Sequence, residues 1–128
     1  MFKHLEALGL AIVAIFAPIK AMLIGTGALI FADLVLGIWA AIKRKEPITS
    51  SGFRRTITKI FVYEIAIMLG YISEHYVSDM VPIVKLIGSV VALVEVKSIL
   101  ENLDDISGKP LLKTVIDKLN STNGNKNE

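Results

Sequence analysis

The chain has 128 residues, a formal net charge of +2 and no cysteine, and 53% of its residues are hydrophobic. This length fits one domain, the small net charge gives no reason to expect a nucleic-acid partner, and the lack of thiols excludes disulfides and cysteine metal sites. Long apolar runs separate the charged residues, a distribution that is typical of membrane proteins and not of soluble domains.

The first two apolar segments, residues 5–19 and 21–42, lie on either side of Lys20. A helix needs about 20 apolar residues to cross a bilayer, so the second segment is long enough and the first is short. We predict that residues 21–42 span the membrane, and that residues 5–19 either cross it or lie at its surface. Trp39 and then Lys43-Arg44-Lys45 end the second segment, an order that is typical of a cytoplasmic boundary.

A basic connection follows, over residues 43–59, in which Glu46 is the single acidic residue. The positive-inside rule predicts that this connection is cytoplasmic, and its cations are expected to contact anionic lipid headgroups. Pro47 and Ser50-Ser51-Gly52 are expected to interrupt regular structure. The cations are Lys43, Arg44, Lys45, Arg54, Arg55 and Lys59.

Two more apolar segments, residues 57–73 and 80–96, are about long enough to span, and the last helix is expected to continue past Glu101. A break around Gly108 precedes apolar residues at helical spacing, which predicts a short amphipathic helix over residues 110–119.

The predicted fold is therefore an all-α integral membrane bundle of three or four transmembrane helices plus that C-terminal helix. It forms a single membrane domain over residues 1–119, followed by a polar tail over residues 120–128 and a cytoplasmic C-terminus.

Asp33 is the most informative single residue, because it lies inside an apolar segment. A charge at mid-bilayer costs about 2.5–3.5 kcal/mol on insertion scales, so it needs a partner, a watery lumen or a proton. Gly37 and Ala41 follow at four-residue spacing on the same helical face and permit close helix approach. Two hypotheses remain: Asp33 lines a pore or a helix interface, or it is a protonated or hydrogen-bonded structural residue.

Glu64 is a second acidic residue within an apolar segment, near the predicted cytoplasmic side. It is a candidate for helix packing or pore lining. The structural alternative is that Glu64 pairs with Arg55 or Lys59, or extends to the membrane surface.

The last apolar segment ends in a polar face. Glu95, Ser98 and Asn102 recur at i, i+3 and i+7 and so share one side of a helix, with Glu101 close by. These four residues are candidates for an oligomer contact near the cytoplasmic mouth. The spacing alone favours the alternative, an ordinary helix that leaves the membrane, where carboxylates are common.

Motifs for catalysis are lacking. His4 and His75 are the two histidines, each isolated in the sequence, and Gly25-Thr26-Gly27 is not followed by the Gly-Lys-Ser/Thr of a phosphate loop. The sequence therefore predicts no enzyme, no cofactor and no metal site.

Three sequence blocks resemble a family of phage lysis holins that also includes holin-like toxin-secretion proteins of Gram-positive bacteria. The first matches an Asp-x-x-x-Gly then Ala-x-Lys region, the second a Ser/Gly loop before a basic helix start, and the third a Glu-x-x-Ser-x-x-Glu-Asn signature. These blocks are Asp33-Leu34-Val35-Leu36-Gly37 with Ala41, Ser50-Ser51-Gly52-Phe53-Arg54 with Lys59, and Glu95 with Ser98-Ile99-Leu100-Glu101-Asn102.

The resemblance implies a multi-pass protein of the bacterial cytoplasmic (inner) membrane. Such a protein forms homo-oligomers and opens lesions that release or activate an endolysin for host lysis. It implies the lipid bilayer, further copies of the chain and the endolysin as partners, with or without direct endolysin contact, and allows an antiholin. Two alternatives remain: a holin-like channel that exports one toxin or bacteriocin, and a structural membrane scaffold that forms no pore.

Overall fold

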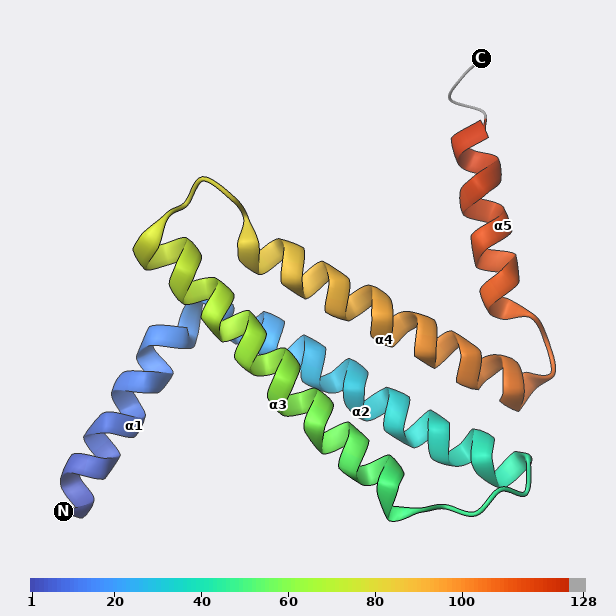
Figure 1. The fold of residues 1–128 in the computed structure, drawn as a ribbon, viewed down its shortest axis with the longest axis horizontal. Helices are drawn as coiled ribbons and strands as arrows, with labels where there is room; N and C mark the ends of the chain where they lie inside the picture. The colour runs from blue at the N-terminus through green and yellow to red at the C-terminus, as the bar shows by residue number, and fades with distance from the viewer. Residues whose placement is uncertain (125–128) are drawn as a thin grey trace.

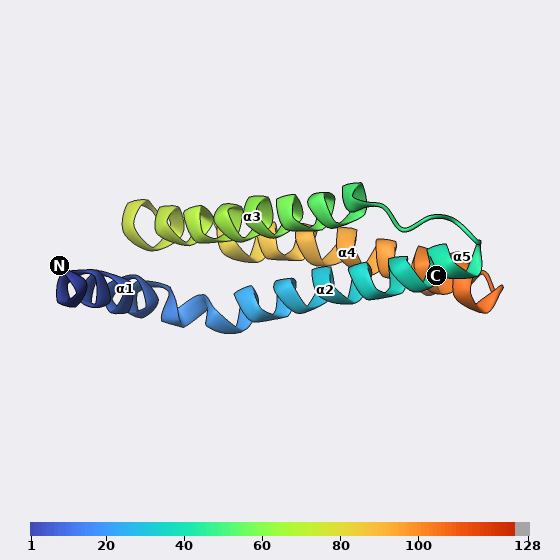
Figure 2. The same cartoon turned by 90° about the horizontal axis from the view of Figure 1, so that it is seen from below.

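The computed structural model describes residues 1–124, and the prediction of an all-α fold is confirmed. Helices α2, α3 and α4 lie side by side, with α3 antiparallel to the other two, whereas α1 and α5 turn away from this bundle at opposite ends (Figure 1). Figure 2 shows the bundle from below. The elements are α1 (Phe2–Phe16), a 3-10 turn (Ala17–Ile19), α2 (Lys20–Lys43), α3 (Ser50–Ile72), a π-helical turn (Ser73–Val77), α4 (Ile83–Ser107) and α5 (Leu111–Gly124).

Helices α1 and α2 form one helical stretch of 42 residues that bends at the 3-10 turn containing Pro18. At 1.5 Å per residue a straight helix of this length would measure about 63 Å, twice the hydrocarbon thickness of a bilayer of about 30 Å. The bend redirects α1 away from the bundle axis (Figure 1). None of the α1 residues is buried, and the Phe16 ring meets the ring of Tyr71 on α3 at 6.1 Å between centroids.

Helix α3 begins at Ser50, seven residues before the segment 57–73 that was predicted to span the membrane. Ser50-Ser51-Gly52, expected to interrupt regular structure, forms its first turn, with extended Thr49 at the N-cap. One glycine in a helix costs only about 1 kcal/mol, too little to prevent the turn. The connection from α2 is consequently short, and Lys45 enters it with a φ of 59°.

The C-terminal part also differs from the prediction. Helix α4 starts at Ile83, three residues inside the predicted span 80–96, and it ends where Gly108 adopts the left-handed conformation with a φ of 70°. Helix α5 does not end at residue 119 but continues to Gly124, so residues 120–124 of the predicted polar tail are helical. Residues 125–128 of that tail lie outside the described residues.

The interior of the bundle is small. One apolar cluster lies near the start of α2 and comprises Ile19, Ile67, Tyr71 and Val84. Two glycines bring the helices close there: a Cβ added to Gly70 would lie 2.8 Å from Ile87 Cδ1. A Cβ added to Gly88 would lie 2.7 Å from the sulfur of Met22. Both glycines therefore set the distance between packed helices.

Most of the large apolar side chains face outward. Four examples, each more than half exposed, are Phe31, Trp39, Phe61 and Leu93. A protein with so much exposed apolar surface would aggregate in water. Among residues 1–124, two stretches, Phe2–Lys43 and Ser50–Val77, are long and apolar enough to cross a membrane, and only 6% and 17% of their most apolar parts are buried. Helix α4, which contains the predicted span 80–96, is not one of these stretches. A core helix of a soluble protein would be mostly buried, so the exposed surface favours lipid contact.

Candidate functional site

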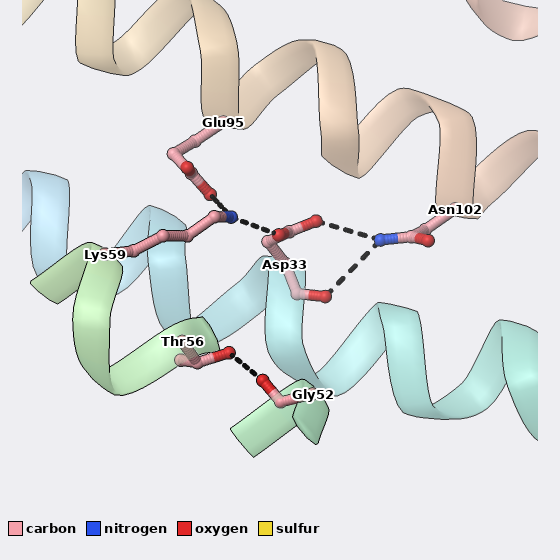
Figure 3. A network of polar contacts seen from close by, with 6 residues as sticks. All are labelled: Asp33, Gly52, Thr56, Lys59, Glu95 and Asn102. Atoms are coloured by element: carbon pink, nitrogen blue, oxygen red, sulfur yellow. Dashed lines mark hydrogen bonds and ion pairs between the residues drawn. The ribbon is translucent and has the colours of Figure 1, made fainter. Parts of the chain in front are cut away.

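Three charged side chains from three helices meet inside the bundle (Figure 3). Lys59 on α3 donates hydrogen bonds to Asp33 Oδ2 on α2 at 2.8 Å and to Glu95 Oε2 on α4 at 2.9 Å. The side chains of Asp33, Lys59 and Glu95 are 12%, 20% and 0% exposed. One lysine thus bridges two carboxylates that neighbouring helices hold against it, and the ion pairs tie α2, α3 and α4 together.

Asn102 extends this group towards the end of α4. Its Nδ2 donates to Asp33 Oδ1 at 2.9 Å and approaches the Asp33 backbone carbonyl at 3.4 Å. Gly37 faces the same amide, because a Cβ added to it would lie in van der Waals contact with this Nδ2, at 3.5 Å. We call Asp33, Lys59, Glu95 and Asn102 the polar seam.

The polar seam is not fully satisfied. Oε1 of Glu95 is buried and has no hydrogen-bond partner among residues 1–124. Two carboxylates face one ammonium group, so the seam carries a net negative charge when all three groups are ionised. A buried polar atom without a partner typically costs about 1–3 kcal/mol. The seam is therefore a high-energy feature of this arrangement as well as a link between helices.

A second polar contact joins α2 and α3 nearer the N-terminal end of α2. The hydroxyl of Thr26 on α2 lies 2.8 Å from Glu64 Oε1 on α3 and also 2.9 Å from the Met22 carbonyl. Glu64 therefore neighbours Thr26 and not Arg55 or Lys59, the partners that the sequence suggested. Lys59 is turned inward to the polar seam instead.

At the end of the bundle that holds the α2–α3 connection, Arg44 links two acidic side chains. It pairs with Asp105 at the end of α4 and with Glu46 at 3.0 Å, and Lys43 donates to the Ile106 carbonyl. The hydrogen bond from Arg44 lowers the pKa of Glu46 below its ordinary value, with desolvation opposing the shift and Coulomb attraction supporting it. These contacts join the C-terminal ends of α2 and α4.

A cavity of about 430 Å³ opens beside the polar seam, between α2, α4, the connection and the first turns of α3. Ala41, Arg55 and Ser98 are part of its wall, together with Asp33 and Lys59. Polar and charged side chains thus reach from the buried seam to the basic end of the bundle.

The other residues proposed from the sequence lie elsewhere. Glu101 faces outward and pairs with Lys97 at 3.3 Å, on the side of α4 away from the polar seam. Lys45 and Arg54 are exposed. Glu95, Ser98 and Asn102 do share a face, as their spacing predicts, but that face is directed at α2 and α3 of the same chain.

Two features escaped the sequence analysis: Thr26 as a neighbour of Glu64, and Lys59 as the centre of the seam. For Lys59 the sequence did contain a signal. Lys59 lies at the start of one apolar segment, and it is a suitable ion-pair partner for Asp33 and Glu95, the carboxylates of two others. For Thr26 no signal existed, because threonine is common in apolar helices.

The side chains of the polar seam link three helices and place charges between them, and they do not form a catalytic arrangement. Within the part of the chain that the structure describes, no three His, Asp or Glu side chains are grouped as metal ligands. The polar seam contains no nucleophile and base in contact.

Comparison with known proteins agrees with the sequence blocks described above. A model of the bacteriophage holin family matches residues 10–123, nearly the whole chain. Comparisons with curated proteins and with solved structures gave no match.

Proposed function

The chain belongs to the bacteriophage holin family, and from this we propose that it oligomerises in the inner membrane of a bacterial host and opens lesions that release or activate an endolysin. Holins are membrane proteins without enzymatic activity, so their function is to insert into the membrane and to permeabilise it. The observation that carries the proposal is the polar seam, a set of charges enclosed by three helices whose outer surfaces are apolar.

In the proposed topology α2, α3 and α4 cross the membrane. Helix α4 packs along α2, and its charge at membrane depth, Glu95, pairs with Lys59, which it shares with Asp33. Lys85 and Lys97 lie nearer the ends of the apolar part of α4, where long side chains reach the interface. The end with Lys43, Arg44 and Lys45 is cytoplasmic by the positive-inside rule.

Helix α1 is not a fourth member of the bundle in this topology. Its 15 residues would span only about 22 Å, less than the hydrocarbon thickness, and it runs across the bundle axis at the end opposite the basic connection (Figure 1). The N-terminus then lies outside, and the C-terminus inside.

A lesion needs a wall that water can wet, and the polar seam is the main source of one at membrane depth. In the single chain the seam faces inward and lipid meets apolar side chains. When neighbouring copies replace the contacts among α2, α3 and α4, the seam can turn towards a common lumen and its charges become hydrated. Glu101 and Lys97, on the outward side of α4, are available to a neighbouring copy.

The ion pairs also explain why opening would be a collective event. Removing one partner of a buried ion pair costs about 3–5 kcal/mol, so a single chain in lipid keeps its seam closed. Hydration in a lumen shared by many copies removes that penalty. We therefore propose that copies accumulate harmlessly until enough of them assemble.

The test is induction of the chain in a bacterium, with and without a separately expressed endolysin. We expect the membrane potential to remain normal while the protein accumulates and then to collapse abruptly, with turbidity falling only when the endolysin is present. A normal potential at high membrane content would contradict lesion formation and would favour the scaffold alternative.

A further inference from the structure

Helix α5 is fixed at a defined angle to α4, although the two helices are joined by only a short turn. The left-handed Gly108 ends α4, and the Asp104 carboxylate then accepts hydrogen bonds from the backbone N–H groups of Leu111 at 2.6 Å and Leu112 at 3.3 Å. A carboxylate on free N–H groups at a helix start is a stable cap. The direction of α5 is therefore set by α4.

That direction leads away from the bundle (Figure 1). Leu111 and Leu112 are half-buried at the junction, whereas Val115, Ile116 and Leu119 are 43%, 46% and 62% exposed. These apolar residues form one continuous side of α5, because their spacing follows the helical repeat. No helix of the same chain covers this side among residues 1–124.

The charges of α5 are arranged around the apolar side in an ordered way. At about 100° per residue, Lys113 and Lys118 lie near its two edges, and Asp117 lies on the opposite, polar side. Lysines at the edges can bury their aliphatic stems and still reach headgroup phosphates. Lys109, in the turn before α5, adds a third cation at the same end of the molecule.

We propose that α5 lies in the cytoplasmic surface of the membrane, with Val115, Ile116 and Leu119 embedded below the headgroups and the flanking lysines on anionic phosphates. The proposal rests on the membrane topology given above, because the basic end of the bundle must lie at that surface. The lysines at the edges of the apolar side favour an anionic lipid surface over a protein partner.

The chain has one tryptophan, Trp39, so a single fluorescent reporter can be moved to α5. The full chain carrying Trp39→Phe and Leu119→Trp is reconstituted into vesicles of phosphatidylcholine and phosphatidylglycerol with brominated acyl chains as quenchers. The matched control is Ser121→Trp in the same background, because Ser121 lies on the polar side two residues away. We expect blue-shifted tryptophan emission and strong quenching by the brominated chains for Leu119→Trp. For Ser121→Trp we expect neither the blue shift nor the quenching.

Other outcomes overturn the proposal. Equal exposure of both reporters to water would place α5 off the membrane, and a blue-shifted Leu119→Trp without lipid quenching would mean that a second copy covers it. Dye release from the same vesicles separates this failure from failure of the holin function. Dye release combined with an α5 that is exposed to water overturns only the proposal about α5. Extraction of the chain from the vesicles by alkaline carbonate overturns both this proposal and the holin function.

A second experiment tests the charge. Replacing Lys113 and Lys118 together by Gln should reduce the quenching of Leu119→Trp in vesicles containing phosphatidylglycerol. Vesicles of phosphatidylcholine alone should show a smaller change. Equal quenching of the parent and the double variant in the anionic vesicles would show that anionic headgroups do not hold α5.

Discussion

Lys59 Nζ lies 2.9 Å from Glu95 Oε2, and the Glu95 side chain is completely buried although 36 residues separate the two in the chain. The same ammonium group contacts Asp33. Lys59 is thus the one cation that allows two carboxylates to lie between packed apolar helices. This relationship leads to the most direct test of the polar seam.

We predict that Lys59→Met destabilises the folded bundle by about 3–5 kcal/mol, because it leaves two buried carboxylates without their cation. Unfolding of the purified protein in detergent, followed by circular dichroism, measures the change. Lys97→Met is the matched control: Lys97 is exposed and pairs with Glu101 one turn away, a contact worth about 0.3–0.5 kcal/mol. Equal losses for both variants would contradict the role of the seam.

The contact between Asp33 and Asn102 predicts coupling between α2 and α4. We expect Asp33→Leu to change lysis timing without preventing membrane insertion, because the apolar residue inserts well but strands the amide of Asn102. The free energies of unfolding of Asp33→Leu, Asn102→Ala and the double variant should give an interaction energy of about 0.5–3 kcal/mol. Unchanged timing at equal expression, with additive stabilities, would contradict this prediction.

Gly70 predicts a steric effect at the other end of the bundle. A side chain at Gly70 meets Ile83 and Ile87 on α4, so Gly70→Leu should push α3 from α4 and cost about 1–3 kcal/mol of stability. Gly25→Leu is the control, because nothing lies within 4 Å of its added Cβ. The midpoint of thermal unfolding in detergent compares the two, and a larger loss at Gly25 would be inconsistent with the observed packing.

The lack of cysteine makes the topology directly testable. Single-cysteine variants at Lys3, Ser51, Ser78 and Ser121 can be labelled with a membrane-impermeant maleimide on intact spheroplasts. We expect labelling at Lys3 and Ser78 from outside, and at Ser51 and Ser121 only after permeabilisation. Protection of the Lys3 variant in intact spheroplasts, with labelling after permeabilisation, would instead show that α1 crosses the membrane.

Glu46 provides a prediction about pH. Because the Arg44 hydrogen bond lowers its pKa, the ionised carboxylate stabilises the connection at neutral pH, and this contribution is lost as the pH falls through the lowered value. Arg44→Gln should raise the pKa of Glu46, because it removes both the hydrogen bond and the Coulomb attraction that lower it. An NMR titration of the Glu46 carboxyl measures the shift, and identical titration curves in both proteins would refute the interaction.

Much of the architecture follows from the sequence, because long apolar runs and basic flanks reflect the membrane environment directly. Residues 21–42 correspond to α2, and the spacing of Glu95, Ser98 and Asn102 does place them on one face of α4. Helix ends were less accurate, as at α3 and α5, because short polar stretches such as Ser50-Ser51-Gly52 and residues 120–124 fit both a helix and a loop.

By itself, then, the sequence determined the helical class, the apolar surfaces, the family and the presence of a carboxylate, Asp33, within an apolar segment, since each depends on residue type and local spacing. Only the tertiary structure decided that Lys59 turns inward between Asp33 and Glu95, that Glu64 neighbours Thr26, and that α1 and α5 leave the bundle at opposite ends. Local periodicity identifies the face of a helix but not the helix that meets it. Those partners depend on how α2, α3 and α4 are arranged in space. This arrangement brings together buried charged side chains that are far apart in the chain.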